Sequence, residues 1–419
     1  FQFVGGLGMF LYGMNQMADG LQKSAGRRMQ KLLGVLTSNR LMGVLLGAGI
    51  TAIIQSSSAT TIMVVGFVNA GLMDLTQAVG VIMGANIGTT VTSWIVSMSE
   101  WGEMLKPEFF APVLVGIGAG IILFARDSRK REAGEILTGF GFLFIGLSFM
   151  SSSIEPYRDA PVFADIFSVL GRNPLLGILA GAAVTAIIQS SSASVGILQT
   201  LALNGVVNWQ SAIFITLGQN IGTCITAILS SVGAHRTAKR AAAIHLLFNV
   251  MGAVIFGILM GVIFFMNPAL AGSRISSVEI SIFHTIFNVS NTILLFPFAG
   301  ALVKLSGMML GKKKASPGEV SLDEQMSRHL DTRLLETPPL AIEQVQTEII
   351  SMGEAAIHNL KLAGQALVAG KEDNIREVFE NEAMIDRMQK LLAGYLVEIS
   401  NQSLNEEQHL VVKNLFYTI

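Results

Sequence analysis

The stretch Thr51-Ala-Ile-Ile-Gln-Ser-Ser-Ser-Ala59 occurs twice in this chain, the second time as Thr185 to Ala193, 134 residues further on. Both copies lie in the middle of long apolar stretches, residues 41–72 and 174–207. The arm from 41 to 54 would be only about 21 Å long as a helix, which is too short for a hydrocarbon core of about 30 Å. We therefore expect both stretches to be re-entrant hairpins, which enter and leave a membrane on one side.

Other motifs recur with the same spacing. The matched pairs are Asn86-Ile-Gly-Thr89 with Asn220-Ile-Gly-Thr223, Thr92 with Thr226 and, with one residue of slip, Gly6–Gly13 with Gly139–Gly146. We interpret the chain as two repeats, about 5–125 and 133–266, followed by an extra span over 280–308. The alternative is a duplication that serves folding symmetry alone.

The composition separates a membrane domain from a soluble one. Hydrophobic residues make up 51% of the chain, charged residues only 14%, and the mean hydropathy is +0.57, which is unusual for a soluble domain. Residues 1–310 hold 29 of the 57 charged side chains, and the last 109 residues hold the other 28. This predicts a transmembrane domain over 1–311, a linker over 312–339 and a cytosolic helical domain over 340–419. The net charge of −1 says nothing about a nucleic-acid partner, and because no sizeable basic face emerges we expect none. The single Cys224 excludes an internal disulfide.

Charge counting orients the predicted spans. With the N-terminus outside, the cytoplasmic segments hold 16 Lys and Arg side chains and the external segments four, as the positive-inside rule requires. Three crossings separate the two hairpins, so they must enter from opposite faces, which is the plan of many secondary transporters. The sequence therefore predicts an all-α membrane protein, an inverted-repeat transporter working by elevator or rocking motion, with about seven full spans. The predicted spans are 3–20, 76–99, 109–125, 133–150, 210–232, 241–266 and 280–308.

The repeated polar segments are suited to binding an anion. A break in each helix exposes N–H groups at a helix N-terminus, where partial positive charge favours anions, and the serine and glutamine side chains add donors. The alternative is that these residues only bond to their own helix or join neighbouring helices. The candidate substrate-binding residues are Gln55, Ser56, Ser57, Ser58, Gln189, Ser190, Ser191 and Ser192.

The lack of charge in these segments points to a co-bound cation. Residues 41–73 and 173–234 contain no Asp, Glu, Lys or Arg, so a multiply charged anion would be desolvated with no fixed cation to offset the cost. Neutral oxygen ligands suit sodium, whereas no carboxylate is present to carry a proton. A neutral substrate remains the alternative. The candidate sodium ligands are Asn86, Thr89, Thr92, Asn220, Thr223 and Thr226.

Two His-x-x-Phe-Asn patterns, His245–Asn249 and His284–Asn288, mark the last two spans. His and Asn four residues apart share a helix face; we expect interhelical hydrogen bonds, with metal ligation as the alternative. No Walker loop, carboxylate pair or nucleophile triad is present, and Ser-Ser-Ser without a general base is not catalytic. We therefore expect a protein that is not an enzyme.

These motifs resemble the type II sodium–phosphate cotransporter family. The resemblance covers about residues 1–308 and rests on both Gln-Ser-Ser-Ser segments, on Gly84–Thr90 and Gly218–Cys224, and on the His-x-x-Phe-Asn spans. It implies sodium-coupled transport of inorganic phosphate across a bacterial cytoplasmic (inner) membrane, without an organic cofactor. It also implies Gln189, Ser190, Thr223 and Thr226 as leading sodium ligands. The alternatives are a phosphate exporter, or a membrane phosphate sensor without net transport.

The chain departs from that family in two places. The His-Asp-Phe-Phe-Asn segment of animal members, whose Asp is associated with an extra sodium site, has no counterpart near 109–125. In addition, Cys224 stands where the first repeat has Thr90. These departures bear on how many sodium ions accompany each phosphate.

The pattern of the last residues predicts amphipathic helices over 341–369 and 372–400 and a third helix that reaches residue 419. They resemble PhoU-like domains, which are often fused to bacterial transporters of this type, and we expect this domain to be incomplete. Glu382 and Asp386 fit the acidic metal motif of that family, whereas a solvated helix face is the alternative reading. An oligomeric or cytosolic regulatory partner could bind through this domain.

Overall fold

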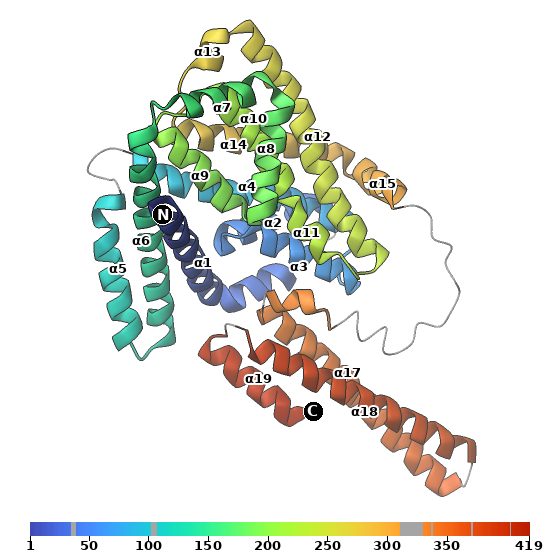
Figure 1. Cartoon of the computed structure of the whole chain (residues 1–419). Helices are drawn as coiled ribbons and strands as arrows, with labels where there is room; N and C mark the ends of the chain where they lie inside the picture. Colours follow the sequence, from blue (N-terminus) through green and yellow to red (C-terminus); the bar gives the residue numbers. More distant parts are fainter. Residues whose placement is uncertain (35–38, 102–106, 311–329, 337, 370–371, 403) are drawn as a thin grey trace. The chain divides into compact units, whose positions relative to one another are not determined.

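The computed structural model describes residues 1–34, 39–101, 107–310, 330–336, 338–369, 372–402 and 404–419. Within these residues the secondary structure is helical, apart from one isolated bridge between Asn208 and Arg274 (Figure 1). The all-α class predicted from the sequence is confirmed. The chain divides into two compact units, residues 1–65 with 74–312, and residues 66–73 with 313–419.

The first unit contains the long apolar helices. Its α-helices are α1 (Gln2–Gly34), α2 (Arg40–Ile54), α3 (Ser57–Asn69, which continues into the second unit), α4 (Leu75–Ser97), α5 (Pro107–Phe124), α6 (Ser128–Ile154), α7 (Pro161–Arg172), α8 (Pro174–Ile188), α9 (Ser191–Leu203), α10 (Trp209–Gly222), α11 (Cys224–Ser230), α12 (Arg236–Met266), α13 (Pro268–Gly272), α14 (Ser277–Leu295) and α15 (Ala299–Met309).

Five helical segments are long and apolar enough to cross a membrane. They are Leu75–Glu100, Ser128–Tyr157, Trp209–Ser230, Arg236–Met266 and Ser277–Met309. They correspond to five of the seven stretches predicted from the sequence. The other two, 3–20 and 109–125, are helical as parts of α1 and α5 but do not meet the same standard of length and hydropathy among the described residues.

Each Gln-Ser-Ser-Ser segment breaks a helix at its glutamine. Gln55 ends α2 with φ 53° and ψ 24°, and Gln189 ends α8 with φ 58° and ψ 21°. Among the described residues these are the only two non-glycine residues with positive φ. Such left-handed backbone is uncommon for a residue with a Cβ, so the matched pair indicates a defined turn from one helix into the next. We call α2 with α3 the first hairpin and α8 with α9 the second; that both are re-entrant stays a prediction.

The packing of the helices repeats with the spacing of the sequence. A Cβ added at Gly47 on α2 would collide with the carbonyl oxygen of Val81 on α4, and one at Gly181 on α8 would collide with that of Ile215 on α10. Each residue of the second pair lies 134 positions after its counterpart. Small residues let helix backbones approach this closely in membrane proteins, so α2 with α4 and α8 with α10 are copies of one packing arrangement.

Helices α1 and α6 lie side by side and run in opposite directions, with α5 on the other side of α6 (Figure 1). Gly13 on α1 meets the backbone of α6 at Gly139, and Gly139 in turn meets the backbone of α1. The fully buried side chains of Phe10, Phe144 and Leu147 fill the contact. The first helices of the two repeats are thus packed directly on one another.

The second unit contains η5 (Thr332–Glu336), α17 (Pro338–Ala369), α18 (Glu372–Ser400) and α19 (Glu406–Thr418). Helices α17 and α18 form a long antiparallel hairpin, against which α19 packs near the end that holds η5 (Figure 1). Leu334, Val345, Leu392 and Leu396 are fully buried and form its core. Residues 66–73 belong to this unit as well.

Candidate functional site

The first serine of each triplet starts a helix. Ser56 Oγ accepts a hydrogen bond from the Ala59 backbone N–H at 3.1 Å, and Ser190 Oγ accepts one from the Ala193 N–H at 3.2 Å. This is the ordinary N-cap arrangement, in which a side-chain oxygen satisfies a free backbone donor. The capping serines therefore shape the site, and the next two serines remain for a ligand.

The second and third serines lie in the first turns of α3 and α9. The hydroxyl of Ser57 is buried and has no hydrogen-bond partner among the described residues. Ser191 and Ser192 are also buried, with 8% and 6% of their surface exposed. A buried hydroxyl without a partner is costly, and at the positive end of a helix it is well placed to donate to an anion.

The tip of the first hairpin contacts both repeats. Thr92 Oγ1, on α4, donates to the Oε1 atom of the buried Gln55 at 3.0 Å, and Gln55 Nε2 donates to the Ala52 carbonyl. On α11, the hydroxyl of Thr226 lies 3.3 Å from that of Ser58. Two of the predicted sodium ligands, one from each repeat, are thus brought to this hairpin.

The tip of the second hairpin is in a different environment. Gln189 is exposed, and no side-chain hydrogen bond is found for it within the part of the chain that the structure describes. The preceding helix α8 exposes Val184 and Ile187, the latter at 81%. Thr226 does not bind Gln189 as Thr92 binds Gln55. Two tips with the same sequence and the same backbone turn therefore have different surroundings.

Four of the predicted sodium ligands share one pattern of hydrogen bonding, whereas Thr92 donates to Gln55 instead. Each of the four uses its donor on the backbone carbonyl one turn earlier in its own helix, which leaves its oxygen to accept. The bonds are Asn86 to Ile82 (2.8 Å), Asn220 to Thr216 (2.9 Å), Thr89 to Ala85 (2.9 Å) and Thr223 to Gln219 (2.9 Å). All four side chains are buried, so they present neutral oxygens, the type of ligand that a hard cation prefers.

Two buried glutamines, Gln199 and Gln219, were not predicted as site residues from the sequence. Gln199 on α9 donates through Nε2 to the Ser93 carbonyl at 3.0 Å and lies 2.9 Å from Ser281 Oγ, joining the second hairpin to α4 and α14. Gln219 donates to the Ser194 carbonyl at 2.9 Å. Their repeat counterparts are the apolar Val65 and Ala85. The signal available in the sequence was a polar residue in the second repeat at a position where the first repeat has an apolar residue.

Of the two His-x-x-Phe-Asn patterns, the first, His245–Asn249, joins two helices. Asn249 Nδ2 lies 3.4 Å from Cys224 Sγ, which links α12 to α11, whereas among the described residues Asn288 bonds only its own helix, at the His284 carbonyl. No group of three or more His, Cys, Asp or Glu side chains suited to a metal occurs among the described residues.

In the tail, Glu382 accepts a hydrogen bond from Asn359 Nδ2 at 3.3 Å, and Asp386 is exposed. Metal binding at this pair stays a prediction.

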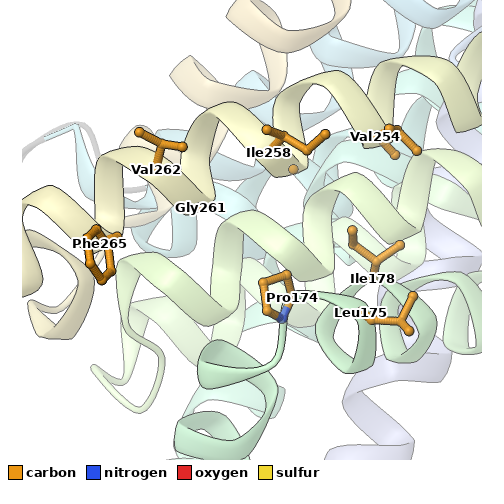
Figure 2. A pocket seen from close by; sticks show the side chains of 10 residues that line it. Pro174, Leu175, Ile178, Val254, Ile258, Gly261, Val262 and Phe265 are labelled. Atoms are coloured by element: carbon orange, nitrogen blue, oxygen red, sulfur yellow. The ribbon is translucent and has the colours of Figure 1, made fainter.

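Two cavities lie away from the hairpin tips. Figure 2 shows an apolar groove of about 490 Å³ between α8 and α12, lined by residues such as Ile178, Ile258 and Phe265. Its carbon-rich walls offer a phosphate nothing to bind. A polar cavity of about 540 Å³ lies at the end of α9 and is lined by Glu100, Glu155, Arg158, Arg274 and Glu279 among others.

Repeated helix packing, matched helix breaks and five apolar helices define a membrane protein of duplicated design. The chain belongs to the Na+/Pi-cotransporter family, whose model matches residues 9–152 and 160–287, and a PhoU domain model matches residues 349–415. The resemblance inferred from the motifs is thereby confirmed, and the chain is placed in a membrane. The matched family is a transporter family, consistent with the expectation of a protein that is not an enzyme.

Curated relatives agree with the family assignment. The chain is 25% identical over 403 residues to the "Putative inorganic phosphate export protein YjbB" of Escherichia coli K12, covering 96% of this chain and 71% of the relative. It is 30% identical over 305 residues to the uncharacterised YqeW of Bacillus subtilis, covering 73% and 96%. It is 31% identical over 160 residues to the rat sodium-dependent phosphate transport protein 2A, covering 38% and 25%. No solved structure matches the chain.

Proposed function

We propose that this chain is a sodium-coupled secondary transporter of inorganic phosphate and that the two hairpin tips form its substrate site. The observation that carries the proposal is the matched pair of helix N-termini, each with buried serines, in segments without any charged side chain. The family and the names of its relatives supply phosphate and sodium as the chemistry to test.

Phosphate would be held by donors alone. Ser57, Ser58, Ser191 and Ser192 would give hydroxyl bonds beside the free N–H groups of α3 and α9. Ser56 and Ser190 would keep those helix starts in shape, with Gln55 and Gln189 setting the turn before each. Because no fixed positive side chain lies in these segments, the charge of phosphate would be balanced by ions that enter with it.

Sodium would bind on the oxygens that the helices leave as acceptors. The proposed ligands come in repeat-related pairs, Asn86 with Asn220, Thr89 with Thr223 and Thr92 with Thr226, and Gln189 and Ser190 would complete a site at the second tip. The oxygens of the three repeat-related pairs are neutral and buried, so a cation there would also lower the cost of holding phosphate nearby. This arrangement makes sodium binding and phosphate binding depend on one another.

The unequal hairpins support an alternating-access mechanism. The first tip is tied to Thr92 and approached by Thr226, whereas the second tip leaves Gln189 exposed. In inverted-repeat transporters one repeat moves against the other around the site, which opens it to opposite sides in turn. We propose that the opposite state frees Gln55 and docks Gln189, through an elevator or rocking motion. The N-terminal end and the second hairpin would face outside, and the first hairpin the cytoplasm, in a bacterial inner membrane.

The direction of phosphate transport follows from the sodium and phosphate gradients, because a carrier can run either way. The alignment with the Escherichia coli relative covers 96% of this chain, and that relative is named as an exporter. Net phosphate efflux is therefore the second candidate. A sensor that binds phosphate without moving it is the third, since the chain carries a PhoU domain. These candidates predict different fluxes across a membrane.

Labelled phosphate offered to proteoliposomes tests the proposal. With an inward sodium gradient we expect uptake at least tenfold above that with choline, and Thr89→Val and Thr223→Val proteins should need several times more sodium for half-maximal uptake. Thr138→Val is the matched control, because its buried hydroxyl lies on α6, outside the site. Saturable binding without accumulation would favour the sensor and overturn transport.

A further inference from the structure

The loop that ends the first hairpin belongs to the same compact unit as the C-terminal domain. Asp331, which is only 3% exposed, is the centre of the contact. Its Oδ2 atom accepts from Asn69 Nδ2 at 2.8 Å and pairs with Arg333 Nη1 at 2.7 Å, and its Oδ1 atom accepts from the Arg333 backbone N–H at 2.9 Å. A buried carboxylate satisfied this fully holds its partners in one geometry.

The C-terminal domain supplies further groups around this carboxylate. Tyr395 on α18 donates its hydroxyl to the Asp331 carbonyl oxygen at 2.7 Å, and burial raises the pKa of Tyr395, so the hydroxyl keeps its proton. Leu334 is fully buried, and a Cβ added at Gly66 would lie 3.2 Å from its Cδ2 atom. Gly66 is thus the point where the last turn of α3 meets η5 closely.

The second hairpin ends in a comparable way with a different partner. Gly71 and Gly205, 134 residues apart, both have positive φ, at 75° and 66°. Beside Gly205, the Asn204 side chain bonds Ser151 of α6 at 3.0 Å, and the guanidinium of Arg274 lies over the glycine. The end of the second hairpin is therefore held by the membrane domain, whereas the end of the first is held by the C-terminal domain.

We propose that the C-terminal domain restrains the first hairpin through Asp331 and thereby sets the rate of transport, an inference that rests on the proposed function. Helix α3 runs without a break from Ser57 to Asn69. Its first turn carries the candidate phosphate donor, and its last turn is bound to Asp331. A shift of the hairpin tip must therefore be accommodated at Asn69, and a fixed Asn69 must restrict the tip.

A disulfide between Gly66→Cys and Arg333→Cys tests the restraint. A Cβ at Gly66 would lie 3.4 Å from the Arg333 Cβ, close to the spacing of natural disulfides, and the native Cys224 is fully buried. We expect oxidation to form the bond in the full-length protein, to lower phosphate flux in proteoliposomes at least tenfold and to be reversed by reductant. The two single variants should show no loss of flux on oxidation. Absence of the disulfide would overturn the docking, and a disulfide without effect on flux would overturn the restraint.

The rate of disulfide formation is a readout that does not need transport. If ligand binding moves the hairpin tip, it also shifts the equilibrium between docked and undocked Asn69. Sodium with phosphate should therefore change the rate of disulfide formation in the reduced double variant at least threefold. Asn69→Ala, introduced into the double-cysteine variant, should slow disulfide formation at least threefold. Asn204→Ala, at the equivalent end of the second hairpin, should leave the rate of disulfide formation unchanged. If neither sodium with phosphate nor Asn69→Ala changes the rate of disulfide formation, the coupling is overturned. If wild-type protein moves no phosphate but phosphate still alters the rate, the transport proposal fails and the coupling stands.

Discussion

Replacing Ser57 and Ser191 together by alanine is expected to weaken phosphate binding at least a hundredfold. A hydrogen bond to a charged acceptor is worth about 1.5–3 kcal/mol, so each lost hydroxyl corresponds to roughly a tenfold loss or more. Both serines are buried in the first turns of α3 and α9, where water cannot easily replace them. The apparent phosphate affinity in sodium-driven uptake is the quantity to measure.

The capping serines provide the matched control for this double variant. Ser56→Ala with Ser190→Ala removes two N-cap bonds, each worth about 1 kcal/mol of stability, and is expected to lower the thermal midpoint more than the affinity. The Ser57→Ala, Ser191→Ala protein should show the reverse. If both double variants bind phosphate as the wild type does, the hairpin tips are not the substrate site.

Replacing Gly47 by alanine is expected to prevent stable folding of the first hairpin against α4. The new Cβ would collide with the Val81 carbonyl oxygen, so two backbones would have to separate along their length. Overpacking of this kind costs about 3 kcal/mol, a large part of the stability of a typical protein. The yield of monodisperse protein in detergent and its thermal midpoint measure the effect.

Gly49, on the same helix, supplies the comparison. A Cβ there meets nothing within 4 Å, so Gly49→Ala should be tolerated and could gain up to about 1 kcal/mol from better helix propensity. Gly181→Ala in the second repeat should behave like Gly47→Ala, because a Cβ there would strike the Ile215 carbonyl. Equal behaviour of the Gly47 and Gly49 variants would contradict the packing described for α2 and α4.

The sequence predicted the helix breaks because the responsible signals are local. A polar Gln-Ser-Ser-Ser in an apolar stretch, with serine available as an N-cap, is sufficient to place a helix end at Ile54 and at Ile188. Five of the seven predicted spans could be recognised from hydropathy, since the alternation of apolar helices with charged loops is itself local.

The unequal surroundings of the two tips could not be predicted in this way. Gln55 and Gln189 have the same eight neighbours in sequence, yet one is buried and the other exposed. The difference arises from tertiary contacts, among them the Thr92 bond to Gln55. No helix was predicted for residues 161–172, which form the amphipathic helix α7 before the second hairpin.

Side-specific cysteine labelling tests the central claim, that the two hairpins enter from opposite faces of the membrane. Leu41 and Leu175 are repeat-related, lie in the first turns of α2 and α8 and are 56% and 64% exposed, while the native Cys224 is fully buried. In sealed vesicles of known orientation, a membrane-impermeant maleimide should label Leu41→Cys only from the cytoplasmic side and Leu175→Cys only from the outside. Labelling of both variants from the same side would contradict the inverted repeat and the shared site built on it.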